Sequence, residues 1–257
     1  MSPTKPLSSS SLWLPRVVFG SLSLVTFGLG TWQVKRYWWK RNLLEEREAK
    51  LRAPKITLPS RVVKENEHRV AQASGTFQHD KECLIGPRPA PSYIPMHMLH
   101  WGGSVGYHVV TPFLRQNGEE PILVNRGWIP QRLASHRTRA KDDFYGNVTI
   151  EGIVSSGEIP SRYTPDNEPE SGSWLWLDAI AISDSLGFKQ PAYVLNLLSP
   201  VPPSGWPWPH RLESFKDFTI MPSTHLLYVG TWYGLSITFA VLTWIKFGPQ
   251  SVRARFS

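Results

Sequence analysis

The stretch HLLYVGTWYGLSITFAVLTWIKF, His225 to Phe247, decides how this chain is organised. The residues from Leu226 to Ile245 include no acid, base, proline or amide. As an α-helix this run would span roughly 30 Å, the thickness of a bilayer's hydrocarbon core. The sequence therefore predicts a transmembrane helix over 225–247, followed by a tail over 248–257. The alternative, a buried helix of a soluble protein, would require a large domain around it.

A second uncharged run lies near the other end of the chain, over 17–34, with a basic residue on each side. Its glycines and serines are common in membrane helices, where small residues allow close packing. We predict a first transmembrane helix here, after an N-terminal tail over 1–16. A cleaved signal peptide is the alternative, but no A-x-A-like site follows the run. The segment 35–52 is predicted to continue this helix in amphipathic form until Pro54 ends it.

The chain carries a formal charge of +8 and has a pI near 9.7, values that in a soluble protein would suggest nucleic-acid binding. Here the basic residues cluster beside the predicted spans, in KRYWWKR over 35–41 and at Lys246, Arg253 and Arg255. Neighbouring tryptophans suit the same interface, so we predict membrane lipids as partners and no nucleic acid. The single cysteine, Cys83, excludes an internal disulfide and a CxxC redox pair.

Charge alone also predicts an orientation. Eight lysines and arginines lie between residues 35 and 55, after the first span, whereas only Lys5 and Arg16 precede it. The positive-inside rule would then place the central domain on the matrix or cytoplasmic side. The Ser-rich start, with no acid before Glu45, is compatible with mitochondrial import.

The 35–224 segment between the spans is long enough for one extramembrane domain. Alternating β-branched and aromatic residues predict strands over 69–77, 106–114, 121–129, 148–154, 192–198 and 215–221. A turn at Asn117-Gly118 predicts a hairpin, 178–186 a short helix, and the Pro-rich stretches 86–95 and 199–209 loops. The predicted fold class is membrane α+β, with two transmembrane helices flanking a central, mainly antiparallel β domain. That domain would be a small barrel or sandwich with short helices.

Few patterns point to catalysis or to a metal. The G-x-S-x-G match over 102–106 lacks the strand before it and the helix after it that a nucleophile elbow needs. The Met96–His100 stretch, MHMLH, offers soft ligands that suit Cu(I), with an ordinary loop as the alternative. We predict no catalytic residues and no metal site.

Two polar and aromatic patterns have both a structural and a functional interpretation. Arg126 and Trp128, at the end of a predicted strand, would form either a stacked structural pair or a contact for a partner protein. The run from Asp166 to Asp178, with Trp174 and Trp176, is typical of a turn that fixes aromatic rings.

His225 stands at the start of the second span. A polar imidazole at the edge of an apolar helix usually has a structural or functional role. A water-facing interfacial histidine and a hydrogen bond at the helix end are two structural explanations. The functional interpretation is a haem ligand, because haem iron takes axial histidine.

Four blocks of this sequence, in order and together with both spans, resemble the Surfeit-locus cytochrome c oxidase assembly factor family (Surf/Shy proteins). The resemblance extends from Val25 to Phe247. It is carried by VTFGLGTWQVKRYWWK (25–40), by GYHVVTPF (106–113) with ILVNRGWIP (122–130), by the TPDNEP…W…D run (164–178), and by HLLYVGTWYGLS (225–236).

The resemblance implies a non-enzymatic assembly factor that supports haem a insertion into the largest oxidase subunit or stabilises that subunit. A purely structural scaffold that never contacts haem is the alternative. The implied cofactor is haem a, with His225 as ligand and Tyr228 and Trp232, three and seven residues on, facing it. The implied partners are cytochrome c oxidase subunits and other assembly factors.

The resemblance also implies a location. Members lie in the mitochondrial inner membrane with the central domain in the intermembrane space, or in the bacterial cytoplasmic membrane with the domain in the periplasm. That orientation is opposite to the one that the charge count predicts, and we follow the resemblance.

Overall fold

The computed structural model describes residues 13–59, 62–99, 104–188, 193–216 and 222–248. The chain divides into two compact units, one formed by 1–46 with 217–257 and the other by 47–216. The predicted 215–221 strand largely lies outside the described residues, and its first residue ends a 3-10 helix, η9 (Leu212–Phe215).

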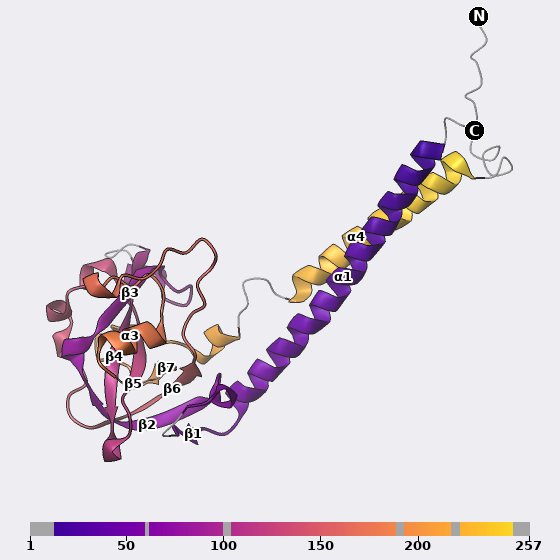
Figure 1. Ribbon diagram of the computed structural model, residues 1–257. Coiled ribbons are helices and arrows are strands. Elements are labelled where there is room, and N and C mark those ends of the chain that lie inside the picture. The colour runs from indigo at the N-terminus through magenta and orange to yellow at the C-terminus, as the bar shows by residue number, and fades with distance from the viewer. Residues whose placement is uncertain (1–12, 60–61, 100–103, 189–192, 217–221, 249–257) are drawn as a thin grey trace, which may run out of the picture. The chain divides into compact units, whose positions relative to one another are not determined.

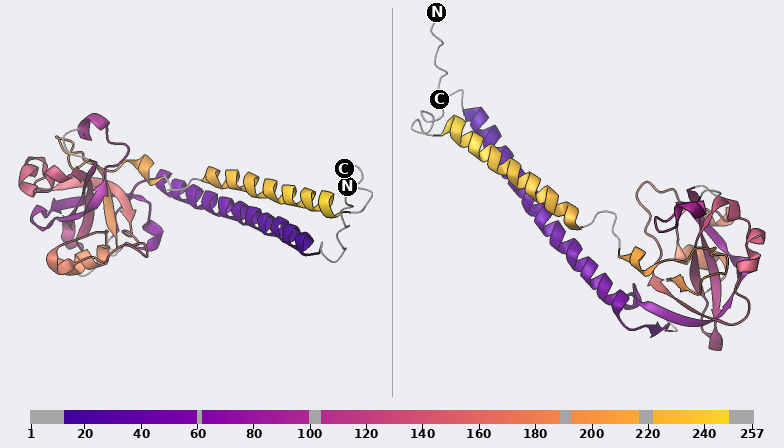
Figure 2. Two further views of the ribbon diagram at one scale, coloured as in Figure 1. Left: turned by 90° about the horizontal axis from the view of Figure 1, so that it is seen from above. Right: turned by 180° about the vertical axis from the view of Figure 1, so that it is seen from behind.

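The first unit is a pair of helices, α1 (Trp13–Arg52) and α4 (Pro222–Phe247), which lie side by side in Figures 1 and 2. Both are long and apolar enough to cross a membrane. The helix α1 continues unbroken through the predicted span and the predicted amphipathic segment. It ends just before Pro54, with Lys50 and Arg52 in its last turn, where cations complement the helix dipole.

The second unit is built on seven strands. They are β1 (Ile56–Thr57), β2 (Val70–Phe77), β3 (Cys83–Pro89), β4 (Val105–Arg115), β5 (Ile122–Pro130), β6 (Val148–Ser155) and β7 (Val194–Ser199). Their order is β1-β2-β6-β7-β5-β4-β3. An additional antiparallel pairing joins β2 to β4, with Phe77 opposite Phe113, so β2, β6, β7, β5 and β4 close into a five-stranded barrel. The sequence left a small barrel and a sandwich as alternatives, and the strand pairing shows a barrel.

Most pairings in the barrel are antiparallel, as predicted, but β5 and β7 pair in parallel. Ile122 and Val124 of β5 belong to the core inside the barrel, which also contains Phe113 and Leu197. Leu123 points to the opposite face, where it packs in a second cluster under α3 (Ala179–Ser185). Both faces of β5 are thus covered, which explains why every residue of this strand is buried.

Short helices lie in the segments that connect the strands and in the one that follows β7. They are α2 (Met96–Leu99), α3 and the 3-10 turns η2 (Lys64–Asn66), η3 (His79–Lys81), η4 (Gln116–Gly118), η5 (Gln131–Leu133), η6 (His136–Thr138), η7 (Ala140–Asp142), η8 (Pro169–Ser171) and η9. The side chain of Asp178 caps α3 by accepting from two backbone amides, and Gly187 follows the helix at φ +73°. The predicted helix over 178–186 is confirmed.

One sequence prediction was wrong. The Pro-rich stretch 86–95 was predicted to be a loop, but its first residues belong to β3. This strand lies at the edge of the sheet and its register shifts between Ile85 and Arg88. Proline is tolerated there because an edge strand leaves some N–H groups unpaired.

Candidate functional site

A row of polar side chains joins α1 to α4. Ser23 and Ser236 each donate a hydroxyl to the other's backbone carbonyl, both at 2.9 Å. Further along, the hydroxyls of Thr31 and Tyr233 lie 3.2 Å apart. Inside a membrane, such bonds satisfy groups that lipid would leave unpaired, and they hold two helices together.

Close packing accompanies these polar bonds. A Cβ atom added at Gly30 would lie 2.6 Å from the ring of Tyr233, so the absence of a side chain on α1 makes room for that ring. Gly30 thus lets the Tyr233 ring of α4 pack against α1, in keeping with the use of small residues between membrane helices.

The row ends at His225, whose Nδ1 lies 2.7 Å from Oε1 of Gln33. Both residues are buried, His225 with 7% and Gln33 with 8% of its surface exposed. The amide oxygen can only accept, so Nδ1 carries the proton of the neutral ring and Nε2 keeps a lone pair. That Nε2 atom is buried and has no hydrogen-bond partner within the part of the chain that the structure describes.

The two other residues predicted to face haem lie on α4 near His225. Trp232, seven residues on, is partly buried on the helix side that carries His225. Tyr228 is 49% exposed and lies at the margin of that side. The positive charges of Lys40 and Arg36 act on His225 from α1.

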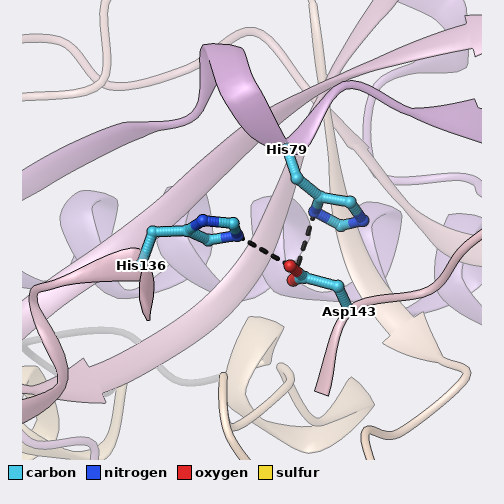
Figure 3. Close-up of side chains that lie close together, drawn as sticks. All are labelled: His79, His136 and Asp143. Carbon is cyan, nitrogen blue, oxygen red and sulfur yellow. Dashed lines mark hydrogen bonds and ion pairs between the residues drawn. The ribbon is translucent and has the colours of Figure 1, made fainter. Parts of the chain in front are cut away.

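A second group of candidate ligands lies in the barrel unit, where His79, His136 and Asp143 converge from three segments (Figure 3). His136 Nε2 lies 2.7 Å from Oδ2 of Asp143, and His79 Nδ1 lies 3.2 Å from Oδ1. The residue types would suit a divalent cation. However, Arg126 Nη1 lies 2.9 Å from Asp143 Oδ1 and 3.1 Å from His79 Nδ1, so a guanidinium already supplies the positive charge.

We therefore interpret this cluster as a buried ion network. A β-bulge creates it, because Val109 pairs with Gly127 and Val110 with Asn125, which leaves Arg126 as an extra residue. Gly127 adopts φ +118° to make the bulge possible. Burial lowers the pKa of His79 below its usual value, despite the hydrogen bond that its Nε2 makes to a backbone carbonyl.

Arg126 and Trp128, the predicted partner contact, are both buried, with 1% and 0% of their surface exposed. The indole Nε1 of Trp128 donates to the carbonyl of Arg88 at 3.2 Å. Their direct contact with a partner protein stays a prediction. The contacts that the structure describes are internal and separate, those of Arg126 with Asp143 and those of Trp128 with Arg88.

The run from Asp166 to Asp178 has a structural role as well. The side chain of Asn167 accepts from the backbone amides of Leu175 and Trp176 and donates to the carbonyl of Trp176. This holds the turn that buries Trp174 beside Ile85. Of the MHMLH stretch, Met96 and His97 are exposed, and His100 lies outside the described residues.

Sequence comparisons place this architecture among known proteins. The model of the SURF1 family matches residues 21–237. A SURF1-like protein of Monosiga brevicollis is 35% identical over 229 residues, which cover 88% of this chain and 85% of the relative. Surfeit locus protein 1 of Homo sapiens is 34% identical over 235 residues, covering 88% and 75%. The protein of that name from Mus musculus is 33% identical over 231 residues, covering 86% and 72%.

Proposed function

The chain belongs to the SURF1 family, and from this premise we propose that it is a membrane-anchored assembly factor for cytochrome c oxidase that holds haem a through His225. Its proposed role is to support the stage at which the largest oxidase subunit acquires haem a. Its proposed partners are oxidase subunits and other assembly factors, and no catalytic step of its own is needed.

One observation carries the haem proposal. His225 Nε2 is a buried nitrogen with a lone pair and no partner in the described residues, at the end of an apolar helix pair. Neutral imidazole nitrogen is the usual axial donor to haem iron, and a lipid-soluble haem suits a site between membrane helices. When bound, haem would supply the redox-active iron that the oxidase requires.

The charges around His225 also suit this ligand. Haem carries carboxylates, and cations attract them most strongly where water is scarce. Lys40 and Arg36 lie on the same helix as Gln33, seven and three residues further on, and their charges act on His225. The residues around this position thus include one nitrogen donor for the iron and two positively charged side chains that would attract the haem carboxylates.

We further propose that the protein lies in the mitochondrial inner membrane with its β domain in the intermembrane space. A bacterial cytoplasmic membrane with the domain in the periplasm is the alternative. Protease protection of intact and osmotically opened mitochondria would test this orientation. Cleavage of the β domain only after the outer membrane is opened is expected, and protection even then would contradict it.

The haem proposal is tested by purifying the full-length protein in detergent from a host that makes haem a and recording its visible spectrum. His225→Ala is expected to lose most of the haem, whereas His97→Ala, at an exposed histidine of the β unit, should retain it. Equal haem in wild type and His225→Ala would refute His225 as the ligand. If no variant carries haem but oxidase subunits still co-purify, the protein acts as a structural scaffold.

A further inference from the structure

We propose that Gln33 is a positioning residue for His225: it fixes the proton on Nδ1 and so presents Nε2 as the ligand atom. This inference rests on the proposed function, since the ligand in question is haem iron. It concerns a residue on the other helix, 192 positions away in sequence.

The hydrogen bond itself gives the first argument. A neutral imidazole has one N–H, and its two tautomers place that proton on different nitrogens. At 2.7 Å from Nδ1, the Gln33 oxygen accepts the proton of only one tautomer. Gln33 therefore selects the tautomer whose Nε2 carries the lone pair, and it also fixes the plane of the ring.

The rest of the polar row gives the second argument. Ser23 and Ser236 satisfy each other, since each donates to the other's carbonyl. Thr26, also buried, donates only to carbonyls of its own helix. Among the described residues of the first unit, 13–46 and 222–248, His225 alone leaves a buried side-chain nitrogen or oxygen without a partner. A histidine that served only to join two helices would leave that acceptor unsatisfied at a cost.

The kind of acceptor has a chemical consequence. Histidines that bind metals usually donate their second N–H to a carbonyl or a carboxylate, and loss of that partner typically weakens metal binding 10–100-fold. An amide oxygen is a weaker acceptor than a carboxylate, so Gln33 leaves the ring less electron-rich than a glutamate would. Gln33→Glu should therefore keep the tautomer but increase the donor strength of Nε2.

The experiment uses full-length protein in detergent, titrated with haemin and followed by the Soret absorbance. We compare wild type, His225→Ala, Gln33→Leu, Gln33→Glu and the control Thr26→Val, which removes a buried hydroxyl of α1 whose hydrogen bonds stay within its own helix. Gln33→Leu should weaken haemin binding roughly 10–100-fold. Thr26→Val should leave it unchanged, and Gln33→Glu should bind haemin with a more negative reduction potential.

A second measurement does not depend on haem. Nitrogen NMR of ¹⁵N-histidine-labelled protein reports which ring nitrogen carries the proton, with the His225 signal identified by its absence from His225→Ala. Wild type and Gln33→Glu should show the Nδ1–H form, and Gln33→Leu should lose it. Circular dichroism of each variant verifies that the helices remain.

The outcomes separate the two proposals. If His225→Ala abolishes haemin binding but Gln33→Leu binds as wild type, the positioning role is refuted while the ligand assignment holds. If His225→Ala binds as wild type, the ligand assignment fails, and with it the positioning role toward haem. An Nε2–H form of His225 in wild type overturns the inference whatever the titration shows.

Discussion

Two stacked histidines in the barrel unit should make its stability depend on pH. The rings of His108, on β4, and His210 lie 5.4 Å apart at an interplanar angle of 12°. His108 Nδ1 and His210 Nε2 are buried and lack partners among the described residues. Burial, and then the charge of Arg88, lower the pKa of His108 to about 4. Burial, and then the charge of the neighbouring His108, lower the pKa of His210 to about 3.

The sign and size of the effect follow from proton linkage. Above pH 6.5, the ordinary value for histidine, both rings are neutral in the folded and unfolded states and pH has no effect through them. As the pH falls below 6.5, the two histidines bind protons in the unfolded chain but stay neutral in the folded domain. The free energy of unfolding therefore decreases. At pH 5 each ring should cost about 2 kcal/mol, and the two together about 4 kcal/mol.

Urea unfolding of the full-length protein in detergent, followed by tryptophan fluorescence between pH 7.5 and 5, measures this loss. The double variant His108→Phe/His210→Phe keeps two stacked rings but cannot be protonated, so it should lose about 4 kcal/mol less than wild type over this range. His97→Phe, which removes an exposed histidine, should follow wild type. Parallel pH profiles for wild type and the double variant would refute the reasoning.

Other predictions follow from the packing. Trp128→Ala should destabilise the barrel unit by about 3–5 kcal/mol, because it empties a fully buried site, and urea unfolding would detect this; an unchanged midpoint would argue against the core role. Gly30→Val should separate the helix pair, whereas Gly28→Val should not, because nothing lies near that position. Disulfide yield in a protein carrying Ser23→Cys and Ser236→Cys measures this, and equal yields would contradict it.

Hydrophobic pattern was enough to predict the two apolar helices and five strands of the barrel. The strand β5 illustrates why, since Ile122 and Val124 face the barrel core while Leu123 faces the second cluster. The pattern failed at β3, where prolines signal a loop unless the strand is known to lie at a sheet edge. That position is a property of the assembled sheet, which no local pattern encodes.

The site was only half predictable for a similar reason. His225 stands out because an imidazole is unusual at the end of an apolar run. Gln33 gave a comparable signal, as the only amide in the uncharged stretch 17–34, but its meaning depends on the pairing of α1 with α4. Likewise, Arg126 meets Asp143 only because a β-bulge turns its side chain into the domain.

The surroundings of the histidines explain why His225 is the best candidate ligand among those that the structure describes with their hydrogen bonds. Both ring nitrogens of His79 are engaged, one with a backbone carbonyl and the other in the ion network. His108 and His210 each have an unpaired nitrogen, but these rings stack on each other inside the barrel unit. At His225 an acceptor on the other helix, Gln33, holds one nitrogen, while the second nitrogen lies buried in the apolar helix pair and keeps a free lone pair. That arrangement is the one in which histidine binds a metal most readily.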